Sequence, residues 1–524
     1  MPSIFRLFQT VRHLKYSQVI YQLRYRRTGK LLKRIQIDRP APEGRLPPLK
    51  VKANLLTYQP GEEPLLTGAA RFYFLNLPHD FGSVAAIDWE LADYGKLWTY
   101  NLHYFEYLRQ PKMTLATGQE LIDAWIENEQ DFTTGWEPYP LSLRLINWLQ
   151  FYRTHGKLTL PAHVHESVHR QYENLQKKLE FHLGGNHLLE NLTALRVTAD
   201  YFADVNMARL LGELLQRQLY QQYITQGHHY EFSPLYHRLL LWRQLELTTF
   251  DPAYINFEPS FLELQLTHAN RLSGSGDRPG PHFNDSTEGI APPIKAIQNL
   301  AGALKIRPYA IKDVLPFLYR EMGPLQCWMD LGSPGPAHQP GHSHADNLTF
   351  CLYLRGRPII VDTGISTYEK NERRAYERST AAHNTVTMGE QNSSDVWGGF
   401  RMGRRAKTEL LVMADNQVAG YYKGPHKFSR SHIRSWEFYS SHLLITDNIV
   451  SLSPGTARLH FAAGLTPRME GDTCRVDNLT ITVEGSTSWQ LVPYQQALGF
   501  NRLADAWCLE TVFISELKTK ISYS

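Results

Sequence analysis

The sequence has little cysteine and no long apolar run. Four cysteines occur in 524 residues, at Cys327, Cys351, Cys474 and Cys508, and none of them forms a CxxC pair. So few cysteines exclude a disulfide framework and predict reduced, mostly buried thiols. No stretch of about 18 apolar residues occurs, so no membrane-spanning helix is predicted.

Acidic residues are absent from the first 37 positions, which carry nine Lys or Arg side chains and apolar residues at roughly helical spacing. No apolar core and cleavage site typical of a secretory signal follow, which favours a cytoplasmic location or the periphery of the inner membrane over the periplasm. We expect residues 1–37 to form a helical arm that packs on the body of the protein. The alternative is peripheral contact with an anionic membrane surface.

The composition is that of a soluble globular protein, with 42% hydrophobic and 20% charged residues. A chain of 524 residues is too long for one ordinary core, so two or three domains are expected. The net charge of +4 is mild, and no nucleic-acid partner is predicted from it. The oligomeric state is not determined by any of these features.

Hydrophobic periodicity changes once along the chain. The Pro-rich segment 39–48 reads as a linker that completes an N-terminal arm, residues 1–48. Residues 49–325 mostly show the three- and four-residue spacing of helices, stacked as antiparallel hairpins. Residues 326–524 show short β-rich runs between turn residues, typical of an antiparallel β-sandwich. A cleft between the two parts is the default binding site.

Residues 341–405 hold the densest cluster of chemically active side chains. Within residues 341–383 there are three histidines and two aspartates, interleaved with strand-forming runs: His342, His344, Asp346, Asp362 and His383. This combination is typical of a metal site or of an acid–base site.

Two further segments lie in the helical part. GGNHLLEN places Asn186 and His187 in the first turn of a long helix, where free N–H groups and the helix dipole favour a bound anion. Ordinary N-capping is the alternative. In HYEFSPLYH, Ser233-Pro234 reads as a helix start and places Tyr236 in the first turn. The alternative there is a core tyrosine.

These segments together resemble the heparinase II/III-like polysaccharide lyases. The matching features are GGNHLLEN, HYEFSPLYH, GHSHADNLTF, VDTGISTY, RSTAAHNTVT and VWGGFRMGRRA. The resemblance covers most of residues 90–410. It implies a multidomain α+β fold, in which an incomplete α/α toroid precedes the antiparallel β-sandwich.

The resemblance also implies β-elimination at a uronic acid of an anionic polysaccharide. The uronate carboxylate must be neutralised, one group must remove the C5 proton, and another must protonate the departing O4. Asn186 and His187 are the candidates for neutralisation. Tyr236 and His342 are the candidates for acid and base, and the sequence does not decide which is which.

In metal-bearing relatives the positions of His344, Asp362 and His383 are zinc ligands. The resemblance therefore implies a zinc site here, which we expect to be structural, and no organic cofactor. The alternative is a metal-free polar network of the same side chains. Further residues are expected to line the substrate subsites: Trp136, Tyr139, Arg144, Asn147, Glu190, Tyr230 and Arg378.

Two rival functions remain open at this point. A glycoside hydrolase needs two carboxylates that flank the scissile bond, and Glu190, Glu231 and Asp285 are available. A non-catalytic protein that binds a polyanion or assists the assembly of a surface polysaccharide is the second rival. The basic arm favours this second alternative.

Overall fold

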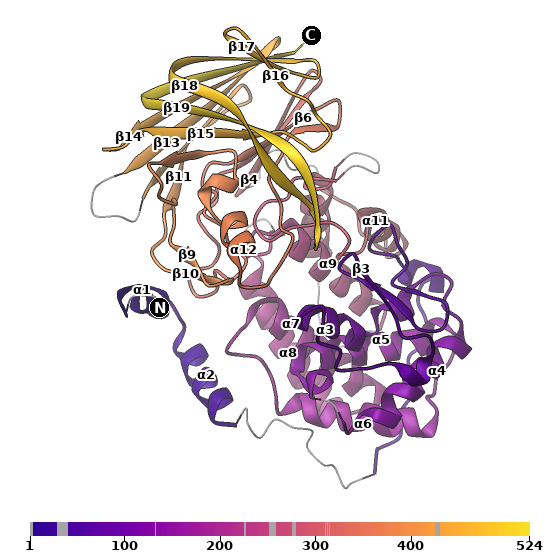
Figure 1. Cartoon of the computed structure of the whole chain (residues 1–524). Helices are drawn as coiled ribbons and strands as arrows, with labels where there is room; N and C mark the ends of the chain where they lie inside the picture. Colours follow the sequence, from indigo (N-terminus) through magenta and orange to yellow (C-terminus); the bar gives the residue numbers. More distant parts are fainter. Residues whose placement is uncertain are drawn as a thin grey trace.

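The chain is mainly helical in its first part and mainly β-sheet in its second part (Figure 1). This arrangement confirms the predicted mixture of helix and sheet, in the predicted order. The computed structural model describes residues 4–28, 40–131, 133–224, 227–250, 258–274, 279–309, 311, 313, 315–424 and 430–523.

Long helices with short connections form the first part. They are α3 (Lys96–Tyr104), α4 (Leu115–Asn128), α5 (Pro138–Thr154), α6 (Ala162–Gln176), α7 (Gly185–Tyr201), α8 (Val205–Gln222), α9 (Pro234–Thr248), α10 (Pro259–Arg271) and α11 (Ile294–Ala303). Helix α5 is buried along most of its length, and it packs against α3, α6 and α7. A helix that is buried on all sides is a central element, and α5 therefore forms the middle of this part.

Antiparallel sheets form the second part. The smaller sheet has the order β4 (Phe317–Met322), β5 (Leu325–Asp330), β6 (Phe350–Leu354), β7 (Arg357–Ile360). The larger sheet follows the order β11 (Lys407–Met413), β12 (Gln417–Lys423), β13 (Ser431–Tyr439), β14 (His442–Val450), β19 (Arg502–Tyr523), β18 (Leu479–Gly499), β17 (Thr473–Val476), β16 (Arg468–Glu470). Strand β15 (Gly455–His460) pairs with β19 and with β8 (Val386–Met388).

The two sheets share one apolar core. Phe350 of β6 and Trp436 of β13 both belong to it, with their ring centroids 6.4 Å apart. A separate core fills the space between the helices and includes Trp98, Trp125 and Trp148. All four cysteines are buried and unpaired, as the sequence predicts.

The β18–β19 hairpin joins the two parts of the molecule at its far end. Asn76 donates to the backbone oxygen of Phe500 at 2.8 Å, and Asn501 donates to that of Leu75 at 3.1 Å. Leu75 and Asn76 form the turn between β2 (Arg71–Phe74) and β3 (Leu77–Asp80) of a small sheet that also contains β1 (Leu66–Thr67). The hairpin tip therefore fixes the sheet part against the helical part.

The β6–β7 hairpin is irregular. Leu354 pairs with Arg357 across the tight turn, but a bulge then pairs Leu352 with Ile360. A regular two-residue hairpin would set Asp362 opposite Thr349, and the bulge changes that register by one residue.

The N-terminal arm forms α1 (Ile4–Val11) and α2 (Tyr16–Thr28). Helical structure is thus present where it was predicted, and residues 1–3 and 29–37 of the arm lie outside the described residues. The arm contacts the body through both helices, but Ile4 and Phe8 of α1 remain exposed. Within the described ranges, no helix has the length and hydrophobicity needed to cross a bilayer.

Candidate functional site

The site begins at the start of α7. Gly184 and Gly185 have φ angles of 67° and 53°, in the left-handed region that favours glycine. They place Asn186 and His187 in the first helical turn, as predicted. A Cβ atom on Gly185 would overlap with Oε1 of Glu231. Glycine at position 185 therefore allows Glu231 to approach the beginning of α7.

Glu231 itself lies just before α9. Ser233 caps this helix by accepting from the Tyr236 N–H at 3.3 Å, and Pro234 occupies its first position. The predicted helix start is therefore confirmed. The Ser233 hydroxyl also donates to the backbone oxygen of Asp285 at 2.6 Å, which anchors the turn. The side chains of Glu231 and Tyr236 both contact His342.

His342 contacts both of these side chains. Its Nδ1 is hydrogen-bonded to Oε2 of Glu231, and its ring lies parallel to that of Tyr236 with 3.9 Å between centroids. Burial alone would raise the pKa of Glu231, but the adjacent His342 and its hydrogen bond hold that pKa below its usual value. An ionised carboxylate only accepts, so Nδ1 carries the proton and Nε2 is the nitrogen left for a substrate.

Tyr236 has a second partner in the sheet part. Its hydroxyl lies 2.9 Å from the hydroxyl of Tyr368, whose ring centroid is 6.4 Å from that of His342. Burial, and then the neighbouring Tyr368, raise the pKa of Tyr236 well above its ordinary value. The hydroxyl of Tyr236 therefore keeps its proton, and it can serve as a proton donor.

His187 is paired with a carboxylate. Its Nδ1 lies 3.1 Å from Oε1 of Glu180, and its ring centroid lies 4.3 Å from that of Tyr139. Burial alone would lower the pKa of His187, but the Glu180 carboxylate raises it above 6.5. Asn186 donates to the Tyr139 hydroxyl at 3.4 Å, and its buried Oδ1 has no hydrogen-bond partner.

These residues lie close together although they come from distant segments. The turn at Gly185 touches Glu231, Glu231 binds His342, and His342 stacks on Tyr236. The His187 charge also acts on Glu231. The structure thus brings the predicted Asn186, His187, Tyr236 and His342 into one site between the helical part and the sheet part.

Asp285 stabilises the segment that carries His342. It accepts two hydrogen bonds from Arg374, at 2.5 and 2.6 Å, and its Oδ1 lies 2.8 Å from Nε2 of His344. Its backbone N–H donates to the backbone oxygen of His342 at 3.1 Å. Burial alone would raise the pKa of Asp285, but Arg374 lowers it far below the usual value. Asp285 is therefore a charged anchor for the segment that carries His342.

The predicted metal ligands lie next to this anchor. His383 Nδ1 is 2.7 Å from Oδ2 of Asp362, and the ring centroids of His383 and His344 are 5.3 Å apart. Nδ1 of His344 and Nε2 of His383 are buried without a hydrogen-bond partner. Unpartnered imidazole nitrogens fit a divalent cation such as zinc. As the side chains stand, no described group of three or more His, Cys, Asp or Glu residues has metal-binding geometry.

Several residues that were predicted to line substrate subsites are buried in the core. Trp136 donates its indole N–H to the backbone oxygen of Glu129 at 2.7 Å. Arg144 is fully buried over the Trp125 ring. Asn147 accepts from Arg109 at 2.9 Å inside the helical part. Large side chains at helical spacing are as common in cores as in subsites, and here the core explains them.

Arg378, which was also predicted to contact the substrate, is likewise engaged within the protein. It is buried and donates to the backbone oxygens of Ser343 and Gly399, at 2.8 Å each. Glu190 is buried and accepts from Nε of Arg243 at 2.8 Å. Tyr230 is buried as well, with its ring 5.7 Å from that of His338. Among the predicted subsite residues, Tyr139 alone is partly exposed at the site.

Sequence reasoning did not assign roles to three residues that shape the site. Glu231 holds His342, Glu180 holds His187, and Tyr368 holds Tyr236. A signal was available for Tyr368, because it is the tyrosine of the VDTGISTY motif. Glu231 could have been found because it lies two residues before Ser233, the N-cap of α9. No pattern in the sequence pointed to Glu180.

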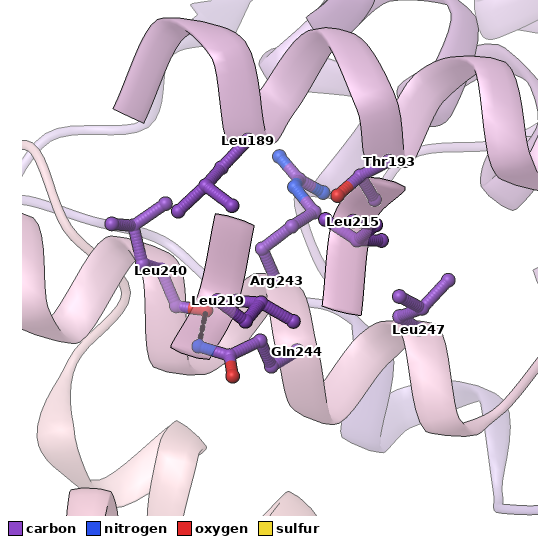
Figure 2. A pocket seen from close by; sticks show the side chains of 8 residues that line it. All are labelled: Leu189, Thr193, Leu215, Leu219, Leu240, Arg243, Gln244 and Leu247. Atoms are coloured by element: carbon purple, nitrogen blue, oxygen red, sulfur yellow. Dashed lines mark hydrogen bonds between the residues drawn. The ribbon is translucent and has the colours of Figure 1, made fainter. Parts of the chain in front are cut away.

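A small cavity among α7, α8 and α9 lies apart from this site (Figure 2). It is lined mainly by leucine side chains, with Thr193, Arg243 and Gln244. The Arg243 guanidinium binds Glu190 and Glu246, and Gln244 donates to the backbone oxygen of Leu240 at 3.1 Å. Arg243 and Gln244 are thus already engaged by other residues of the helical part.

Comparison with known proteins finds similarity mainly in the sheet part. Residues 317–520 match the family model "Heparinase II/III-like, C-terminal". A heparin-sulfate lyase of Bacteroides thetaiotaomicron is 31% identical over 124 residues, which are 23% of this chain and 16% of that protein. The corresponding protein of Bacteroides stercoris is 27% identical over 125 residues, 23% of this chain and 18% of that protein. The aligned stretch thus spans under a fifth of these relatives.

Comparison with solved structures covers nearly the whole chain. The crystal structure of a heparinase III has a TM-score of 0.66 and 15% identity, over 97% of this chain and 91% of that chain. A mutant heparan sulfate lyase of Pedobacter heparinus has a TM-score of 0.58 and 17% identity, over 97% and 88%. At these identities the likeness shows a shared fold. The predicted resemblance to this family is confirmed.

Proposed function

Because residues 317–520 match the heparinase II/III-like C-terminal family model, we propose that this chain is a polysaccharide lyase. Its substrate would be an anionic polysaccharide that contains uronic acid, as the names of the heparin-sulfate lyase relatives suggest. The observation that carries the proposal is the Glu231–His342 pair stacked on Tyr236. In the proposed fold, an incomplete α/α toroid and an antiparallel β-sandwich enclose this site.

In the proposed reaction His342 is the base. Glu231 fixes the proton on Nδ1, so Nε2 offers a lone pair to the C5 proton of the uronate. Tyr236 is the acid, because its raised pKa keeps the hydroxyl protonated until the O4 leaving group takes the proton. The C5–H and C4–O bonds break, a C4–C5 double bond forms, and a new hydroxyl remains on the departing sugar. The Tyr368 hydroxyl, 2.9 Å from that of Tyr236, can resupply the proton.

Neutralisation of the uronate carboxylate falls to the beginning of α7. The proton on C5 is a very poor acid while the adjacent carboxylate keeps its full charge. His187 is held as a cation by Glu180, and Asn186 has a buried polar atom without a partner. Both stand at the positive end of a helix dipole, which favours an anion there.

The contacts of the carboxylates argue against a glycoside hydrolase. Glu231 binds His342, Glu190 binds Arg243, and Asp285 binds Arg374. Hydrolysis requires two carboxyl groups that face the bond from either side. The three carboxylates that were candidates for this role are each bound to a basic side chain, so the geometry favours the lyase.

Zinc is proposed as a structural component, with His344, Asp362 and His383 as its ligands. The unpartnered nitrogens of His344 and His383 support this proposal. When bound, zinc would cross-link the loop before β6, the end of β7 and the segment before β8. Asp362 is already bound to His383, so it would either move to the metal or orient that histidine.

The proposal is tested by incubation with a panel of uronate polymers. A lyase produces unsaturated uronate, which absorbs in the ultraviolet, together with new reducing ends. A hydrolase produces reducing ends without the new absorbance. Retained binding without either product would indicate the polyanion-binding alternative.

A further inference from the structure

The N-terminal arm presents its apolar side chains to solvent. Ile4 is 89% exposed, Phe8 61% and Phe5 57%. We call the residues of this surface the arm face: Ile4, Phe5, Leu7, Phe8 and Val11. An ordinary surface helix turns such a stripe toward the core, so the orientation of α1 is the reverse of the usual one.

Polar side chains of the arm make its contacts with the body. Gln9 is buried, Thr10 accepts from the indole N–H of Trp397 at 3.2 Å, and Gln18 donates to the backbone oxygen of His338 at 3.3 Å. Figure 1 shows α1 below the β9–β10 hairpin (Val396–Trp397 and Arg401–Met402) and α2 beside the helical part. These contacts fix which side of α1 faces outward.

Positive charge lies on α1 and on the residues that follow it. Arg6, Arg12, Lys15 and Arg24 are exposed, and residues 1–37 contain no acid. An exposed apolar stripe flanked by cations matches an anionic phospholipid surface, because the apolar groups enter the interface while the cations meet the headgroups. We propose that α1 docks this protein on an anionic membrane surface. This inference does not depend on the proposed lyase activity.

Two other occupants fit the arm face less well. A polyanionic polysaccharide would satisfy the cations but offers no apolar surface for Phe5 or Phe8. A second copy of the chain would cover the apolar residues, but a twofold contact would also bring two sets of Arg6 and Arg12 together. The bilayer is the partner that complements both properties.

The arm also lies at the rim of the candidate site. Tyr25 of α2 stacks on His182 with 4.4 Å between centroids, and Tyr21 contacts Phe181 at 4.7 Å. Both partners lie directly after Glu180, which holds His187. A protein docked through α1 would therefore hold the rim of this site near the lipid surface.

The test is flotation of the full chain with vesicles of phosphatidylglycerol and phosphatidylcholine, and with phosphatidylcholine alone. We expect binding to the anionic vesicles that weakens with salt, and little binding to the neutral ones. The double variant Phe5→Ser/Phe8→Ser should lose affinity about tenfold or more, because it removes apolar area that the lipid would bury. Its melting temperature should change little, because Phe8 is exposed and Phe5 contacts the body only weakly, with its ring centroid 5.8 Å from the Arg404 guanidinium.

A matched control replaces two exposed apolar residues elsewhere. Leu452 is 88% exposed and Ile514 is 67% exposed, so Leu452→Ser/Ile514→Ser should bind vesicles like the unchanged chain. Equal binding by the arm variant, or no flotation with anionic vesicles, would overturn the proposal. So would a dimer in solution that the arm variant abolishes, because the second copy would then be the occupant.

Discussion

The imidazole ring of His342 lies parallel to the phenol ring of Tyr236, with 3.9 Å between centroids and 9° between planes. His342 belongs to the sheet part and Tyr236 to the helical part. The stack therefore exists only when the two parts are held together, as the β18–β19 hairpin holds them. A base and an acid on adjacent rings can act on neighbouring atoms of one sugar.

Replacement of Tyr236 by phenylalanine tests its proposed role as the general acid. The ring and its stack on His342 remain, and only the hydroxyl near Tyr368 is lost. We expect kcat to fall by about 100-fold or more, as for the loss of a general acid, with little change in the melting temperature. Steady-state kinetics and thermal unfolding check this. Near-normal turnover would remove Tyr236 from the mechanism.

Replacement of Gly185 by alanine tests whether Glu231 must hold His342, the proposed base, in position. The new methyl group would displace the Glu231 carboxylate, and φ of 53° would be strained. We expect kcat to fall by about tenfold or more, because His342 loses its fixed partner. Gly302→Ala in α11 is the control, since nothing lies within 4 Å of its new methyl group. Equal kinetics in the two variants would contradict the role of Glu231.

Metal analysis of protein purified without a chelator tests the zinc proposal. We expect close to one zinc per chain and a lower melting temperature after chelation. His383→Ala should lose the metal and destabilise the protein, whereas the exposed His163→Ala should do neither. Metal-free protein with an unchanged melting temperature under chelation would support the polar network instead.

Acid should destabilise this protein through a group of buried histidines. Burial lowers the pKa of His229 to about 4, that of His237 to about 3, and that of His228 well below 6.5. The unfolded chain takes up these protons below about pH 6.5, while the folded chain does not. The free energy of unfolding should thus fall as the pH decreases from 6.5 toward 4, by up to about 1.4 kcal/mol per pH unit for each histidine.

Urea unfolding at several pH values measures this slope. His237→Gln should reduce the slope by about the contribution of one histidine, because the glutamine does not titrate. The variant will be less stable at neutral pH, but the slope is read relative to its own neutral value. A slope that stays unchanged in this variant would exclude His237 as a source of the acid sensitivity.

Sequence patterns predicted the helix starts that carry the site residues better than the tertiary contacts between those residues. The starts of α7 and α9 follow from local rules for glycine, serine and proline, so the positions of His187 and Tyr236 could be predicted. The contact between Gly185 and Glu231 joins segments 46 positions apart and depends on tertiary packing. Arg144 was predicted to line a subsite, but it is buried over the Trp125 ring. The sequence does not distinguish an arginine that packs in the core from one that binds a substrate.

The arm and the β6–β7 hairpin show where local patterns fail. The spacing of Phe5 and Phe8 predicts a helix correctly, but it does not say whether the apolar face meets the body or a partner. A bulge in β7 changes the register after Pro358, and no residue type marks it in advance. Such features are determined by the packing of distant segments.

The central claim is that His342 and Tyr236 carry out β-elimination on a uronate polymer. The most direct measurement is the ultraviolet absorbance of unsaturated uronate released from such polymers by the unchanged chain and by Tyr236→Phe and His342→Ala. We predict that at least one polymer gives the absorbance with the unchanged chain and that both variants lose it while still folded. Reducing ends without absorbance, or full activity in either variant, would contradict the account.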